Sequence, residues 1–106
     1  MKQQEFILQL NALHNSILVV KHNEDRIINI AIYRAINKLE ENYIKSNCVL
    51  KKDQLFLHNI TGAEYLIYNI FVNNHGNIAC IFSKVPTDKV KTWTYERLLK
   101  IVKEIN

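Results

Sequence analysis

The stretch GAEYLIYNIFVNNHGNIACIFSKVP, residues 62–86, decides how this chain divides into helices and strands. It contains both glycines and the single proline of the 106-residue sequence, at Gly62, Gly76 and Pro86. Glycine permits positive φ, and proline fixes φ and lacks a backbone donor, so these residues mark turns. The chain before Asn47 can therefore run as helix, the middle must turn repeatedly, and the end can run as helix again.

Within this stretch, the turn at residues 74–76 predicts the register of a β-hairpin. A three-residue loop with Gly76 in the left-handed conformation pairs Asn73 with Asn77. Strand alternation then places an apolar set on one face of the hairpin: Tyr68, Ile70, Val72, Ile78, Cys80 and Phe82. The opposite face is also mostly apolar and carries Tyr65, Ile67, Asn69, Phe71, Ala79, Ile81 and Ser83. An antiparallel sheet with one solvated face normally alternates between apolar and polar residues, so we expect helices or a partner to cover both faces.

Outward from the hairpin, β-branched and aromatic residues between turn residues predict further strands. The predicted strands are residues 54–60, 64–73 and 77–84, with a short additional strand at 48–51 that turns at Lys52 and Asp53. Residues 87–105 predict a C-terminal helix with Thr87 as its N-cap. Because residues 90–95 also alternate, this helix begins either at Thr87 or near Thr94.

Two helices are predicted before the strands. Apolar residues at helical spacing predict the first over residues 2–15, and residues 17–20 fit either its extension or a short strand. The second runs from Asn23, as N-cap, to about Asn47. Its expected buried stripe is Ile28, Ile32, Ile36, Leu39 and Tyr43. The predicted fold class is α+β, as a single domain over residues 1–106: two N-terminal helices, a three- to four-stranded antiparallel meander and one C-terminal helix.

Composition narrows the class of protein. A hydrophobic content of 48% and a charged content of 23% are typical of a globular domain. The net charge of +4 is spread thinly, with six basic and five acidic residues in 1–46, three and two in 47–86, and five and three in 87–106. Nucleic-acid-binding proteins normally cluster their basic residues, so we interpret this charge mainly as a solubility feature.

The sequence favours a soluble, cytoplasmic protein. We find no apolar run of about 18 residues and no signal-peptide pattern. Cys48 and Cys80 form no CxxC motif, which fits a reducing compartment. Frequent Asn and Ile, with Lys favoured over Arg, are typical of an AT-rich genome and suggest a bacterial or phage source.

Motifs that carry chemistry are not found. The four histidines and two cysteines match none of the paired spacings of zinc sites. The sequence also lacks a GxSxG elbow, an HExxH motif and a P-loop. We therefore predict no catalytic residue, metal or cofactor, and keep a small enzyme with a site outside known motifs as a third hypothesis.

The leading hypothesis is a non-catalytic macromolecule-binding module, such as a small inhibitor, immunity or adaptor protein. Its partner would be another protein or a second copy of itself, bound through aromatic, apolar and arginine side chains that are typical of interfaces: Tyr65, Ile67, Phe71, Trp93, Tyr95 and Arg97. The alternative is nucleic-acid binding, in which Trp93 and Tyr95 stack on bases beside a basic cluster: Lys89, Lys91, Arg97, Lys100 and Lys103. A third interpretation packs Trp93 on the core and leaves the lysines in solvent.

Overall fold

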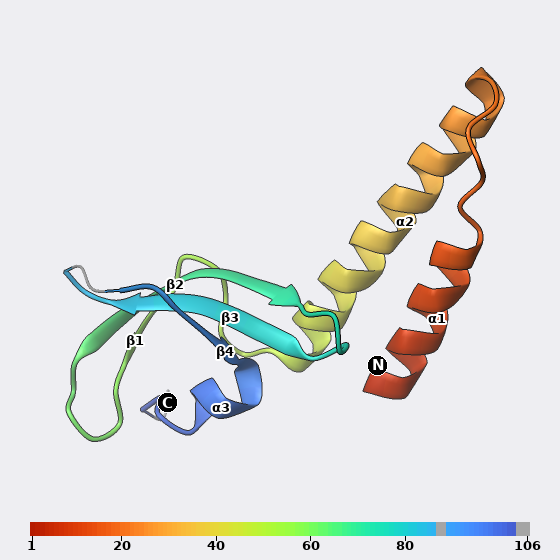
Figure 1. Cartoon of the computed structure of the whole chain (residues 1–106). Coiled ribbons are helices and arrows are strands. Elements are labelled where there is room, and N and C mark those ends of the chain that lie inside the picture. The colour runs from red at the N-terminus through yellow and green to blue at the C-terminus, as the bar shows by residue number, and fades with distance from the viewer. Residues whose placement is uncertain (87–88, 104–106) are drawn as a thin grey trace. The chain divides into compact units, whose positions relative to one another are not determined.

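The computed structural model describes residues 1–86 and 89–103 and confirms the predicted α+β fold class (Figure 1). The elements are α1 (Gln3–Asn15), α2 (Asn23–Asn47), β1 (Leu55–Leu57), β2 (Glu64–Val72), β3 (Ile78–Lys84), β4 (Lys91–Thr94) and α3 (Tyr95–Leu99). They fall into two compact units, unit 1 (Met1–Asn47) and unit 2 (Cys48–Asn106). The single domain predicted over residues 1–106 stays a prediction.

Unit 1 is a hairpin of α1 and α2. The fully buried Phe6 of α1 stacks on Tyr43 of α2, with ring centroids 4.1 Å apart and an interplanar angle of 11°. The first helical hydrogen bond of α2 runs from the Arg26 amide to the His22 carbonyl, at 3.3 Å. Because the N-cap is the residue whose carbonyl accepts that bond, His22 is the N-cap and the prediction of Asn23 is wrong by one residue.

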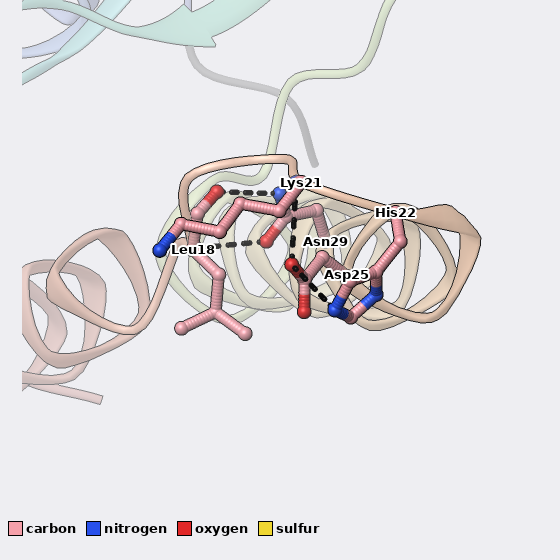
Figure 2. Close-up of polar contacts among 5 residues, drawn as sticks. All are labelled: Leu18, Lys21, His22, Asp25 and Asn29. Carbon is pink, nitrogen blue, oxygen red and sulfur yellow. Dashed lines mark hydrogen bonds and ion pairs between the residues drawn. The ribbon is translucent and has the colours of Figure 1, made fainter.

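The buried stripe of α2 differs from the prediction near its N-terminus. Ile36 and Tyr43 are buried as predicted, whereas Ile28 is 46% exposed. The buried residue there is Asn29, which forms two hydrogen bonds with the backbone of Leu18 (Figure 2). Neighbouring helix positions point about 100° apart, so a helix that turns Asn29 inward places Ile28 on its flank. Residues 17–20 are neither helix nor strand, so both interpretations of that run are wrong.

Unit 2 contains a four-stranded antiparallel meander in the order β1-β2-β3-β4. The turn between β2 and β3 has the predicted form: the Asn73 amide donates to the Asn77 carbonyl at 2.9 Å, and Gly76 has φ of +77°. The register next to the turn is also confirmed, with Ile70 opposite Cys80.

A β-bulge at Tyr68 changes the faces of β2 beyond that point. The register shifts between Ile67 and Asn69, so Ile67 lies opposite Phe82 and Tyr65 opposite Lys84. One extra residue moves every following side chain to the other face. The predicted faces are therefore wrong for Tyr65 and Ile67, which join Cys80 and Phe82, and for Tyr68, which joins Ser83.

The core of unit 2 lies on one side of the sheet, here called the core face. Its buried residues come from the strands, from α3 and from the segment before β1: Leu50, Phe56, Ile67, Cys80, Phe82, Tyr95 and Leu98. The strand predicted at residues 48–51 does not form, because the Tyr95 hydroxyl accepts the Val49 amide at 2.8 Å and binds this segment to α3. The turn predicted at Lys52 and Asp53 is confirmed.

The C-terminal segment follows the second of its two predicted forms. Residues Lys91–Thr94 form β4, and the Thr94 hydroxyl accepts the Arg97 amide at 3.3 Å as the N-cap of α3. The other proposed N-cap, Thr87, lies outside the described residues, as do residues 104 and 105. The predicted continuous helix is wrong after Leu99, because Val102 pairs with His58 in a β-bridge.

Candidate protein-binding surface

The side of the sheet opposite the core face, here called the second face, carries six large apolar side chains. Five are assigned from the strand register, Leu55, Leu57, Leu66, Phe71 and Ile81, and the sixth, Tyr68, is assigned from its hydrogen bond with Ser83. Leu55 is 51% exposed, Leu57 43% and Tyr68 39%, while the other three are half-buried. Polar and small residues on the same face surround and separate them: Glu64, Asn69, Ala79, Ser83, Thr92 and Thr94.

Strand pairing and the bulge together build this surface. Leu55 lies directly opposite Leu66, which joins the apolar residues of β1 to those of β2. The bulge turns Tyr68 onto the second face, where its hydroxyl shares a 2.8 Å hydrogen bond with Ser83 Oγ. On the core face of the sheet, the fully buried Leu98 anchors α3 in the core. The second face is therefore a sheet surface whose side chains are held by the ladder and by the Tyr68–Ser83 bond.

The six residues predicted to bind a protein do not gather on one surface. Phe71 lies on the second face, but Ile67 is fully buried and Tyr95 is 8% exposed, so both belong to the core of unit 2. Tyr65 stacks on Phe56 with ring centroids 5.3 Å apart. Trp93 packs edge-on against Phe82 at 5.1 Å, which confirms the interpretation that places this ring on the core.

Sequence reasoning missed Leu55, Leu57 and Tyr68. Leu55 and Leu57 alternate with Phe56 in a three-residue strand, and this alternation is the signal that places them on the face opposite Phe56. The predicted face of Tyr68 is wrong because β2 carries apolar residues on both faces, so the sequence shows no alternation that would reveal the bulge. Asn69 is the available signal for the bulge, since Asn is depleted in regular strands.

The predicted basic cluster is brought together in part. The Arg97 guanidinium carbon lies 4.0 Å from the centroid of the Trp93 ring, and Lys91 Nζ lies 5.9 Å from it. Lys89, Lys100 and Lys103 are exposed in the same C-terminal segment. Because Arg97 covers a face of the indole ring, that face is engaged within the chain rather than presented for base stacking.

The two thiols are shielded from reaction. Burial raises the pKa of Cys48 to about 11. Burial, and then the neighbouring Cys48, raise the pKa of Cys80 to about 12. Both groups are therefore protonated at neutral pH, and a protonated thiol is a poor nucleophile and metal ligand. Cys80 is fully buried in the core of unit 2.

Among residues 1–86 and 89–103, neither a metal centre nor a membrane-spanning helix is found. No group of three His, Cys, Asp or Glu side chains is placed there to hold a metal ion. In the same residues, no helix has both the length and the apolar character that a bilayer crossing requires. Comparison with known proteins adds no assignment, because no protein-family model, curated protein or solved structure matches this chain.

Proposed function

We propose that this chain is a non-catalytic protein-binding module, of the kind that serves as a small inhibitor, immunity or adaptor protein. The observation that carries the proposal is the second face, where Leu55, Leu57 and Tyr68 are exposed beside Leu66, Phe71 and Ile81. Apolar and aromatic residues with a polar rim are typical of a protein interface. From the composition of the sequence, we also propose a bacterial or phage source and a cytoplasmic location.

The second face is suited to tight binding because it is ordered in advance. Its apolar residues stand on hydrogen-bonded strands, and the bond between Tyr68 and Ser83 restricts the largest of them. A surface that loses little conformational entropy on binding leaves more of its interaction energy as affinity.

The residues of the second face indicate the kind of partner. Among the paired strand residues, the one charged side chain on this face is Glu64, so the face has little charge of its own. An apolar surface with a mostly neutral rim fits a partner surface of the same character. The partner we propose for the second face is therefore another protein with an exposed apolar patch.

The test compares Leu55→Glu with a matched control, Ile60→Glu. Ile60 is 86% exposed in the turn after β1, so the control places the same charge in unit 2 but off the second face. Proteins captured by the wild-type chain would be identified, purified and titrated by calorimetry against all three chains. We expect Leu55→Glu to weaken binding by about a hundredfold, because a buried unpaired carboxylate is costly, and Ile60→Glu to bind as wild type. Equal binding by the three chains, or no purified protein that binds, would overturn the proposal.

The alternative, nucleic-acid binding, rests on the arrangement of Lys91 and Arg97 around Trp93. A fluorescent single-stranded oligonucleotide distinguishes the two functions, since phosphate contacts make affinity fall steeply with salt. Under our proposal the oligonucleotide does not bind at moderate salt. Salt-sensitive binding that is lost in Lys91→Ala would instead favour the alternative.

A further inference from the structure

The sheet of unit 2 has two edge strands, β1 and β4, and the segment that follows α3 pairs with the outer side of β1. The Lys103 amide donates to the Leu57 carbonyl at 2.9 Å, and the Asn59 amide donates to the Ile101 carbonyl at 2.8 Å. The Asn59 side chain also donates to the Lys100 carbonyl at 2.9 Å. Between Leu57 and Asn59, the chain itself therefore occupies this edge of the sheet.

The strand register shows which backbone groups of β4 point away from the sheet. Next to the turn between β2 and β3, the Asn73 amide donates to the Asn77 carbonyl, so these two residues form a hydrogen-bonded pair. Such pairs alternate along an antiparallel ladder, so Cys80, at an intervening position of β3, directs its backbone groups toward β4. Cys80 lies opposite Trp93. The next residue of β4, Thr92, therefore directs its amide and carbonyl away from the sheet.

The outer edge of β4 presents these backbone groups to solvent. By the same alternation the Thr94 amide also points outward, and both threonines are exposed. Within residues 1–86 and 89–103, no hydrogen bond is found to the outward backbone groups of this strand. A row of unpaired donors and acceptors at strand spacing is a template for another extended chain. The ligand that this edge fits is therefore an extended peptide backbone.

Charged side chains beside β4 favour a particular sequence in that peptide. Lys91 Nζ lies 5.9 Å and the Arg97 guanidinium carbon 4.0 Å from the centroid of the Trp93 ring, on the core face of the sheet. A strand added to β4 places every second side chain beside this group, where carboxylates form cross-strand pairs of opposite charge. The intervening side chains lie beside Thr92 and Thr94, where β-branched residues pack well.

A second copy of the chain fits this edge less well. Two β4 strands that pair about a two-fold axis at Thr92 place Lys91 of each copy opposite Trp93 of the other. Lys91 and Arg97 of both copies then gather around one axis, and like charges at neighbouring strand positions destabilise the pairing. An acidic segment of another protein avoids this repulsion.

We propose that the outer edge of β4 binds an extended segment of another protein, which joins the sheet as an added strand and has acidic residues at alternate positions. The Thr92 amide and carbonyl form the central hydrogen bonds, and Lys91 and Arg97 pair with the acidic side chains. This inference uses backbone groups at the opposite edge of the sheet from Leu55 and Leu57, so it does not rest on the function proposed for the second face.

The probe is an acetylated and amidated peptide of about seven residues, close to the usual strand length, that alternates valine and glutamate. Its binding to the full chain is titrated by calorimetry and by the emission of Trp93, the single tryptophan, which lies on β4. We expect saturable binding and a change in this emission. A peptide that alternates valine and lysine should not bind. Absence of binding of the glutamate peptide at about 1 mM, or equal binding of the lysine peptide, would overturn the inference.

Thr92→Pro removes the outward donor. Because this amide points away from β3, the variant should keep the ladder, which circular dichroism verifies, and should weaken binding of the glutamate peptide by about tenfold or more. The matched control is Thr92→Val, which keeps the amide and the β-branched shape and should bind as wild type. Lys91→Glu leaves the backbone intact and should also weaken binding by about tenfold, so the test does not depend on the folding of the proline variant. Wild-type affinity in Thr92→Pro or in Lys91→Glu would contradict the proposal.

Two further measurements distinguish this edge from other surfaces. Leu55→Glu, on the second face, should bind the glutamate peptide as wild type, which separates this inference from the partner binding proposed above. Sedimentation equilibrium without peptide tests the second copy as occupant. A dimer of twice the chain mass of 12.5 kDa that Thr92→Pro dissociates would show that β4 pairs with itself and would overturn the inference.

Discussion

The Asn29 side chain binds both backbone polar groups of Leu18, accepting from its amide at 2.9 Å and donating to its carbonyl at 2.8 Å. In a β-sheet, a residue of the neighbouring strand would form these two hydrogen bonds. Here the side-chain amide of Asn29 forms them instead, so the backbone of Leu18 is satisfied although residues 17–20 are neither helix nor strand. The two hydrogen bonds also explain why the polar Asn29 is buried on the face of α2 that otherwise packs apolar side chains.

Asn29→Ala should destabilise unit 1 by about 1–3 kcal/mol, because the two hydrogen bonds are part-buried and their partners on Leu18 lose them together. Urea unfolding followed by far-UV circular dichroism measures the change, since the helices dominate that signal. Asn37→Ala is the matched control: Asn37 is exposed on α2, so the substitution reports the gain in helix propensity alone. Equal stability of the two variants would show that the bonds to Leu18 contribute nothing.

Tyr95→Phe should destabilise unit 2 by about 1–2 kcal/mol. The Tyr95 hydroxyl accepts the amides of Val49 at 2.8 Å and Leu50 at 3.5 Å, and Leu50 is 2% exposed. A buried amide left without its acceptor incurs a desolvation cost. Trp93 is the single tryptophan and packs on the core of unit 2, so its fluorescence follows unfolding there. Tyr33→Phe, at a residue of α2 that is 52% exposed, should leave this transition unchanged.

Arg97→Ala should shift Trp93 emission to longer wavelength, because the guanidinium 4.0 Å from the ring centroid shields the indole from water. The loss of this cation–π contact should also cost about 0.5–1 kcal/mol, measured by urea unfolding with the same fluorescence. Lys100→Ala removes an exposed charge near by and serves as the control. An unshifted spectrum in Arg97→Ala would mean that the guanidinium does not cover the ring in solution.

The parts of the fold that follow from local chemistry were predictable. Gly76 adopts the positive φ that the three-residue turn requires, which places Ile70 opposite Cys80. Thr94 was one of two predicted helix starts, and its hydroxyl is the N-cap. Both features depend on a few neighbouring residues, and the conformational preferences of such residues can be predicted from the sequence.

The surfaces were less predictable, because they depend on contacts between distant segments. Tyr68 forms a bulge in a strand that is apolar on both faces, so no alternation revealed where Tyr65 and Ile67 change sides. Asn29 is buried because Leu18, eleven residues earlier, supplies both of its partners. An asparagine within a helix is more often exposed, and only the tertiary contact reverses that expectation.

The half-buried Cys48 thiol and the fully buried Cys80 thiol should react slowly with a disulfide reagent in the folded chain. The pKa of Cys48 is raised from 9.0 to about 11, which lowers its thiolate fraction near neutral pH roughly a hundredfold. The pKa of Cys80 is raised from 9.0 to about 12, which lowers its thiolate fraction roughly a thousandfold. Rates measured at about pH 8 with and without urea test this, and we expect Cys48→Ala, which leaves only Cys80, to react more slowly than Cys80→Ala. Rates in the native state that match those in urea would contradict the shielding.

The same pKa shifts predict a loss of stability at high pH. A thiol whose pKa is higher in the folded state than in the unfolded state keeps its proton longer when folded, so its contribution to stability is complete below about pH 9. That contribution falls as the pH rises from 9 through the folded-state values of about 11 and 12. To isolate the effect of the thiols, the decline must be compared with that of a Cys48→Ala, Cys80→Ala double variant. The wild-type free energy of unfolding should fall more steeply with pH than that of the double variant, and parallel declines would show that burial of the thiols does not hold their protons.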